Sequence, residues 1–153
     1  MIRQIVLGIT LLLVLFGCSK NQNSLLITVT SKYNLQETIA KFEKAMTEKG
    51  YVANGIINHT KRAKAENIYL RPTVAFELDN PKTFSALLTC NPSLAIDLPI
   101  RISVYSLLNG DIKLSYTHPE YWSLKHNIKD KNCISVVLSI ARELNIATEA
   151  ITK

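Results

Sequence analysis

The spacing of apolar and polar residues predicts a strand followed by a helix at the start of the main domain. The run Ser24–Thr30 is short, apolar and rich in β-branched residues, which is typical of a strand. Asn34 and Glu37 then form a capping-box pair, and Gly50 marks the end of the helix that they open. Apolar residues at helical spacing predict the buried face of this helix: Leu35, Ile39, Phe42 and Met46.

The same reasoning predicts two further strands and a second helix. Tyr51–His59 is typical of a strand, with a bend or bulge at Asn54-Gly55. Residues 60–67 have room for only a short helical turn. Thr73–Asp79 alternates as a strand does, and Asn80-Pro81 then supply the N-cap and the first residue of the next helix.

The clearest hairpin pattern lies between residues 99 and 118, where two alternating runs flank Asn109-Gly110 as a tight-turn pair. Residues 119–126 predict a short helix or an irregular cover. A last amphipathic helix spans residues 133–146. Its predicted inward face consists of Ile134, Val137, Leu138, Ala141 and Leu144.

The predicted order of elements is β-α-β-β-α-β-β-α. A sheet buries one apolar face against helices, so the natural arrangement has two layers. We therefore predict an α+β fold in which helices pack on one face of an antiparallel or mixed sheet.

The pattern of residues 1–17 is that of an export signal. Arg3 provides a positive start, and the apolar run Ile5–Phe16 is shorter than the roughly 20 residues that cross a bilayer. Leu15-Phe16-Gly17-Cys18 resembles the lipobox of bacterial lipoproteins, although Phe16 is bulkier than the usual residue. The resemblance implies that Cys18 becomes the first mature residue and carries acyl chains such as palmitate, which anchor it to a bilayer. The alternative is an uncleaved signal anchor with an incidental cysteine.

Residues 18–23 are expected to form a polar tether, and residues 24–153 a single domain. The net charge of +6 would suggest nucleic acid as a partner in a cytoplasmic protein, but the export signal argues against it. The densest basic cluster, Lys61-Arg62 with Lys64, lacks interleaved aromatic residues. It is predicted to be a solvated face, with anionic lipid as the alternative contact.

Two cysteines remain after Cys18. In an oxidising compartment Cys90 and Cys133 could pair, and this disulfide would stabilise the fold by about 4 kcal/mol. Both also lie in apolar helical patterns, where a buried free thiol is common. The sequence leaves both possibilities open.

Several short motifs, taken in order, resemble the domain-of-unknown-function 302 family. They are Thr30-Ser31-Lys32-Tyr33, His59, Leu70-Arg71-Pro72-Thr73, Asn80-Pro81, Cys90-Asn91-Pro92, Asp97-Leu98-Pro99 and Ser115-Tyr116. The resemblance implies a compact β-α-β sandwich-like domain, often seen as a dimer, and brings no established activity. Some relatives carry cysteines where this chain has Asp79 and Ile100, so a cysteine-based site is not carried over.

No motif predicts a catalytic residue, a metal site or a cofactor. Zinc sites favour close ligand pairs, whereas His118 and His126 are separated by seven residues that include a proline. The chain has no Gly-x-Ser-x-Gly elbow and no cysteine-protease signature. Cys90 and His59 could form a site only if the fold brought them together. These observations favour a protein that is not an enzyme.

Six polar residues are candidates for a binding surface: His59, Arg71, Asp97, Arg101, Tyr116 and His118. Arg71 precedes a proline and suits an anionic or carboxylate partner. Tyr116 and His118 lie at the end of a strand, where binding sites often form. The alternatives are structural ion pairs for Arg71 and Asp97, and packing for Tyr116.

The leading hypothesis is an envelope lipoprotein that faces the periplasm and binds a small ligand or another envelope protein, with a homodimer as a further expectation. Ser19 after the lipidated cysteine favours the outer over the inner membrane. The alternative is a redox protein, or one that handles metal or haem, using Cys90 and nearby histidines. A purely structural dimer is the third possibility.

Overall fold

The computed structural model of the chain describes residues 25–153. The predictions for the signal peptide, for Cys18 and for the tether fall on residues 1–24 and lie outside the described part. Within residues 25–153, no helix combines the length and the apolar character that crossing a bilayer requires.

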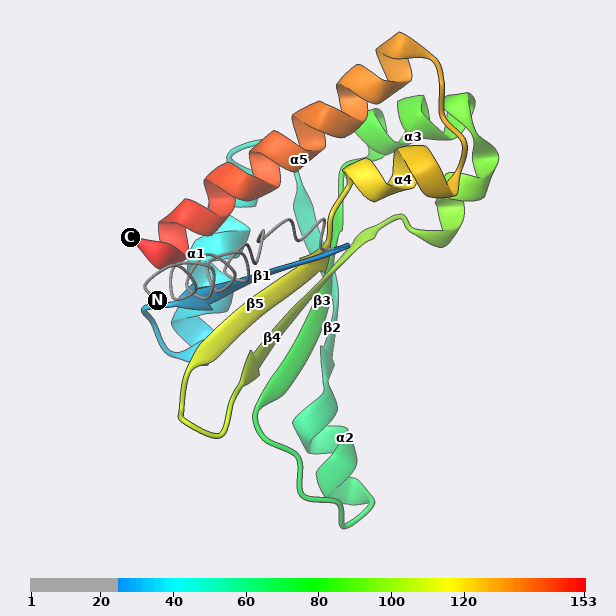
Figure 1. Cartoon of the computed structure of the whole chain (residues 1–153). Coiled ribbons are helices and arrows are strands. Elements are labelled where there is room, and N and C mark those ends of the chain that lie inside the picture. Colours follow the sequence, from blue (N-terminus) through cyan, green and yellow to red (C-terminus); the bar gives the residue numbers. More distant parts are fainter. Residues whose placement is uncertain (1–24) are drawn as a thin grey trace, which may run out of the picture.

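Five strands form one sheet in the order β1-β5-β4-β3-β2, and every pair of neighbours is antiparallel (Figure 1). The strands are β1 (Leu26–Ser31), β2 (Val52–Asn58), β3 (Thr73–Asp79), β4 (Ile100–Ser106) and β5 (Ile112–Thr117). The α+β prediction is confirmed, and the sheet is antiparallel rather than mixed. A bulge between Asn54 and Ile57 lies where the Asn54-Gly55 pair predicted it.

The helices are α1 (Leu35–Thr47), α2 (His59–Ala65), α3 (Pro81–Cys90), the 3₁₀ helix η1 (Pro92–Ile96), α4 (Glu120–Lys125) and α5 (Lys131–Thr152). The predicted caps are present. The Asn34 side chain accepts a hydrogen bond from the Glu37 N–H in a complete capping box, and Asn80 with Pro81 opens α3.

The core lies where α1 and α5 pack against one face of the sheet (Figure 1). Phe42 of α1 contacts Phe76 of β3 edge to face, with ring centroids 6.4 Å apart. Other fully buried side chains here are Met46, Ile102, Val104, Leu114, Val137, Ile140 and Leu144. Burying each such side chain stabilises the fold by about 1.5–3 kcal/mol. Side chains alternate along a strand, so Arg101, Ser103 and Tyr105 of β4 lie on the opposite face.

The last helix is longer than its sequence pattern predicted. It begins at Lys131 because Asp130 caps it, and it continues past Ile146 because Ala147, Thr148 and Ile151 are also buried. The predicted inward face was wrong at Leu138, which is 43% exposed. Leu138 instead lies beside a cavity that is described below.

Two segments between strands also differ from prediction. The hairpin between β4 and β5 uses a five-residue loop, 107–111, rather than a two-residue turn. Gly110 has a φ of +88°, which suits glycine, and the Asp111 N–H donates to the Asn109 side chain. Residues 59–65 form a helix of seven residues, because Asn58 caps it. This helix, α2, projects beyond the sheet (Figure 1).

Candidate functional site

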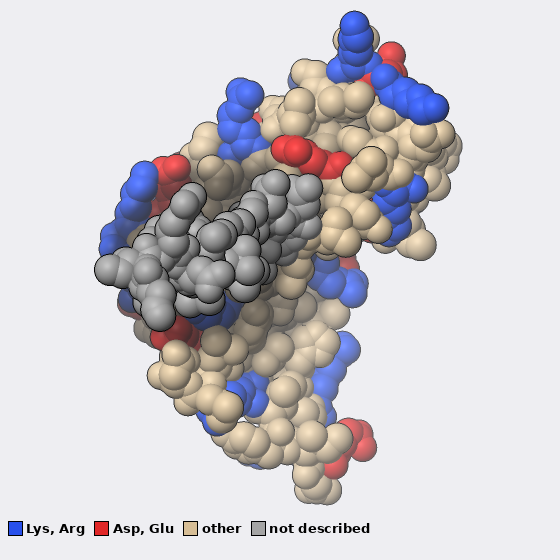
Figure 2. Space-filling model, in the orientation of Figure 1, with Lys and Arg blue, Asp and Glu red and all other residues tan. Residues whose placement is uncertain are grey.

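The structure places the six candidate residues in separate parts of the fold. His59 is the first residue of α2, and Arg71 lies in the loop between α2 and β3. Asp97 directly follows η1. Arg101 forms an ion pair with Glu77 across the exposed face of the sheet. Tyr116 and His118, the last two candidates, lie together beside α5. Positive side chains are dispersed over the face in Figure 2 rather than gathered in one patch.

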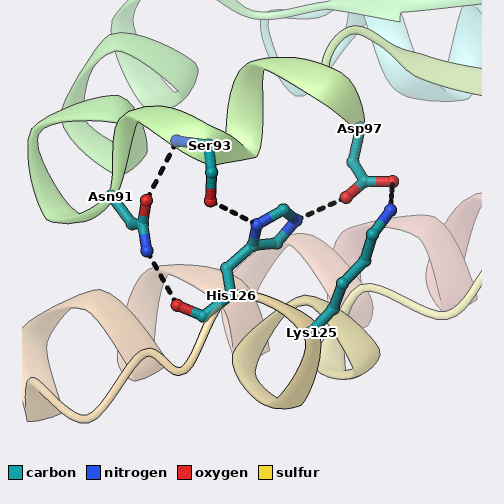
Figure 3. Close-up of polar contacts among 5 residues, drawn as sticks. All are labelled: Asn91, Ser93, Asp97, Lys125 and His126. Atoms are coloured by element: carbon teal, nitrogen blue, oxygen red, sulfur yellow. Dashed lines mark hydrogen bonds and ion pairs between the residues drawn. The ribbon is translucent and has the colours of Figure 1, made fainter.

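A polar cluster joins η1 to the end of α4 (Figure 3). The Ser93 Oγ lies 2.6 Å from Nδ1 of His126, and the opposite ring nitrogen, Nε2, lies 2.5 Å from Asp97 Oδ2. Lys125 donates to the other Asp97 oxygen at 2.8 Å. The Asn91 amide donates to the His126 carbonyl. Sequence reasoning missed this cluster apart from Asp97, because residues about 30 positions apart carry no shared local pattern.

The electrostatics of the cluster favour an ionised Asp97. Partial burial alone would raise the pKa of this carboxyl, but hydrogen bonds and charge interactions with Lys125 and His126 hold its pKa below the ordinary value. The carboxylate only accepts, so a neutral His126 ring donates from Nε2 and accepts from the Ser93 hydroxyl at Nδ1. The structural ion pair expected for Asp97 is confirmed, whereas Arg71 has none among the described residues.

Hydrogen bonds connect Ser93 to His126 and His126 to Asp97, as in the triad of a serine hydrolase. The surroundings do not supply the rest of such a site. The Ser93 N–H donates to the Asn91 side chain and the Leu94 N–H to the Asn91 carbonyl, so neither is free to stabilise an oxyanion. A cavity of about 290 Å³ beside Asp97 does not include Ser93 among its lining residues. The cluster therefore serves to hold η1 against α4.

A disulfide joins the same part of the fold. Cys90, at the end of α3, is bonded to Cys133 in the first turn of α5, with Cα atoms 6.2 Å apart. The sequence left open whether Cys90 and Cys133 are bonded or are free thiols, and the structure contains the disulfide. Neither cysteine is then a free thiol for redox or metal chemistry, and residues 25–153 contain no group of three His, Cys, Asp or Glu side chains that could hold a metal ion.

A second candidate site is a cavity of about 380 Å³ between α5 and the edge of the sheet that β1 and β5 form. We call it the α5 cavity. It is lined by Ile27, Tyr116, His118, Pro119, Glu120, Leu138, Ala141, Arg142 and Asn145. The volume falls within the range of small-molecule sites, about 300–1,000 Å³. It contains two of the six candidates, Tyr116 and His118.

Three polar side chains that line the α5 cavity make no hydrogen bond within residues 25–153, and two of them, Arg142 and Asn145, are exposed. Tyr116 is only 4% exposed, and its hydroxyl makes no hydrogen bond within residues 25–153. The side chains of Arg142 and Asn145 make no hydrogen bond or ion pair in this described part. His118 accepts the Glu120 N–H at Nδ1, which places the ring proton of a neutral His118 on Nε2, where it can still donate.

Sequence reasoning missed Arg142 and Asn145, although a signal for them existed. Leu138 and Ala141 were assigned to the core face of the last helix, and Arg142 and Asn145 follow at positions i+4 and i+7 from Leu138. Leu138, Arg142 and Asn145 therefore share one exposed flank of α5, beside the buried stripe that continues to Ile151.

Comparison with known proteins places the chain in one family. The family described as "Domain of unknown function DUF302" matches residues 27–151. The fold resembles the crystal structure of an uncharacterized conserved protein DUF302 from Bacillus stearothermophilus, with a TM-score of 0.76 and 21% identity, over 84% of this chain and 98% of that chain.

Curated relatives match a smaller share of their own length. The chain is 26% identical over 103 residues to "Fluoride-specific ion channel FluC 1" of Brucella suis, covering 67% of this chain and 41% of the relative. "Fluoride-specific ion channel FluC 2" of Brucella melitensis matches equally well, with 38% of its length covered. The chain thus spans about two fifths of these relatives. With a family match over most of its length, the chain belongs to the DUF302 domain family.

Proposed function

We propose that the protein is a lipid-anchored lipoprotein of the bacterial cell envelope whose DUF302 domain binds a small ligand in the α5 cavity. The observation that carries the binding role is the cavity itself, because the Tyr116 hydroxyl that lines it has no hydrogen-bond partner within residues 25–153. The hydroxyl can therefore donate a hydrogen bond to a ligand that enters the cavity.

Two observations support a location in the envelope. The Cys90–Cys133 disulfide fits export, because such bonds persist in oxidising compartments and are rare in the cytosol. The curated relatives are named as ion channels, proteins that work in a membrane, which agrees with a domain held at a bilayer through Cys18. The domain would face the periplasm, with the outer membrane as the favoured side.

The anchor is tested by changing Cys18. The wild-type protein should incorporate labelled palmitate and sediment with the membrane fraction, and Cys18→Ser should lose the label. Cys90→Ser, in which the other two cysteines remain, is the matched control and should keep both the label and the membrane location. Label that persists in Cys18→Ser would contradict the anchor.

The binding role is tested by native mass spectrometry of the full-length protein released from detergent micelles. Covalent lipid stays on the chain after denaturation, whereas a bound ligand is present only in the native spectrum. We expect such a ligand, and its loss in the double variant Tyr116→Phe/Arg142→Gln. A native mass equal to the denatured mass would contradict the binding role, and a mass of two chains would establish the homodimer that the sequence analysis expects.

A further inference from the structure

The chemistry of the α5 cavity indicates what kind of ligand it would hold, an inference that rests on the binding role proposed above. Its lining supplies four groups that can donate hydrogen bonds: the Tyr116 hydroxyl, the Arg142 guanidinium, the Asn145 amide and Nε2 of a neutral His118. Burial raises the pKa of Tyr116 to about 12, so its hydroxyl stays a donor throughout the physiological range. These donors favour a ligand that accepts hydrogen bonds.

The charges of the lining favour an acceptor with one negative charge over an acceptor with two. Arg142 is its one permanent cation among the lining residues, and Glu120 contributes one carboxylate at the rim. A phosphate dianion would be repelled by Glu120 and would exceed the charge of Arg142. A carboxylate suits the planar fork of the guanidinium, which binds it through two parallel hydrogen bonds.

The remaining walls of the cavity are apolar. Ile27 comes from β1, Pro119 from the segment after β5, and Leu138 and Ala141 from α5. Leu138 is 43% exposed, and an apolar ligand body would cover it. We propose that the α5 cavity binds a small monocarboxylate with an apolar body, its carboxylate held by Arg142 and the Tyr116 hydroxyl.

The test uses full-length protein in nonionic micelles, with titration calorimetry and empty micelles as the blank. The probes are 3-phenylpropionate, octanoate and acetate, together with 3-phenylpropanamide as the neutral match of the first. We expect 3-phenylpropionate and octanoate to bind, acetate to bind at least about tenfold more weakly because it has no apolar body, and the amide to lose at least about tenfold in affinity.

Two variants and one control assign the binding to this cavity. Arg142→Gln should weaken 3-phenylpropionate at least about tenfold, and Tyr116→Phe should weaken it severalfold. Arg62→Gln removes an exposed arginine of α2, which does not line the α5 cavity, and should leave the affinity unchanged. Circular dichroism of each variant verifies that the fold is intact.

The outcomes separate this inference from the proposed function. Absence of binding by all three carboxylates, or equal binding by Arg142→Gln and wild type, would overturn the inference. If native mass spectrometry still finds a ligand in that case, the binding role stands and only the ligand class is wrong. A native spectrum without any ligand, together with no carboxylate binding, would contradict both the binding role and the inferred ligand class.

Discussion

The cluster around His126 and the α5 cavity around Tyr116 differ in whether the fold supplies hydrogen-bond partners for their polar side chains. His126 is 6% exposed and Tyr116 is 4% exposed, so both rings are equally removed from solvent. Both nitrogens of the His126 ring have partners from η1, whereas the Tyr116 hydroxyl has none within residues 25–153. Polar groups that the fold satisfies internally stabilise it, and those it leaves unsatisfied are available to a ligand. The comparison predicts that mutations at the first site reduce stability and mutations at the second reduce binding.

The largest expected effect comes from removing the disulfide beside the His126 cluster. Cys90→Ser/Cys133→Ser should lower the free energy of unfolding by about 4 kcal/mol, because the bond closes a loop across a sequence separation of 43 residues. Urea denaturation of both proteins measures the difference. A reducing agent should shift the wild type by a similar amount and leave the double variant unchanged; equal midpoints for all samples would contradict the prediction.

The next effect tests the cluster directly. His126→Ala removes a buried ring with two hydrogen bonds and should lower the free energy of unfolding by about 2–3 kcal/mol. His118→Ala, at the rim of the cavity, is the matched control and should cost less than about 1 kcal/mol. Similar losses in the two variants would show that the cluster has no special role in stability.

A smaller effect should appear at low pH. The pKa of Asp97 lies below its ordinary value of 3.8, so the unfolded chain takes up this proton at a higher pH than the folded protein does. The stability that Asp97 contributes is therefore complete above its unfolded pKa and is lost as pH falls through its folded pKa. Asp97→Asn should flatten the acid side of the stability profile in urea, measured between about pH 6 and pH 2.

Asp79→Asn serves as the control for this titration, because Asp79 forms no ion pair within the described residues. It should keep the acid slope of the wild type. If Asp97→Asn also keeps that slope, the hydrogen bonds from Lys125 and His126 do not stabilise the charged carboxylate.

The smallest effect on stability is predicted at the cavity. Tyr116→Phe removes a hydroxyl without a partner and should change the free energy of unfolding by less than about 0.5 kcal/mol. Tyr51→Phe is the matched comparison, because the buried Tyr51 donates to Glu143 at 2.8 Å and should lose about 1 kcal/mol. Chemical denaturation of both variants tests the pair, and a larger loss for Tyr116→Phe would reveal an internal partner for its hydroxyl.

The sequence predicted the elements better than the sites, and the reason lies in the range of the interactions. Local signals such as the Asn34–Glu37 capping box and the Asn80-Pro81 helix start act over three or four residues, and both are confirmed. The contact of Asp97 with His126 depends on how η1 packs against α4, which no local pattern specifies.

The sequence did not predict the α5 cavity, although two of its lining residues were among the candidates for a binding surface. Tyr116 and His118 were identified from their place at a strand end, which is a local property. Arg142 lies on a helix that reaches β5 only through tertiary packing. Leu138 was assigned to the core because helical spacing shows which residues share a face but does not show where that face leaves the core.

The strand order has a consequence for the time course of folding. Strands β2, β3 and β4 each pair with the next strand along the chain, whereas β1 pairs with β5, so Leu26 meets Thr117 across most of the domain. Contacts between distant residues form late, because a long loop must close first. A chain synthesised from its N-terminus can pair β2 with β3, β3 with β4 and β4 with β5 in turn, but β1 has to wait for β5. The strand nearest the proposed anchor would then be the last to join the sheet.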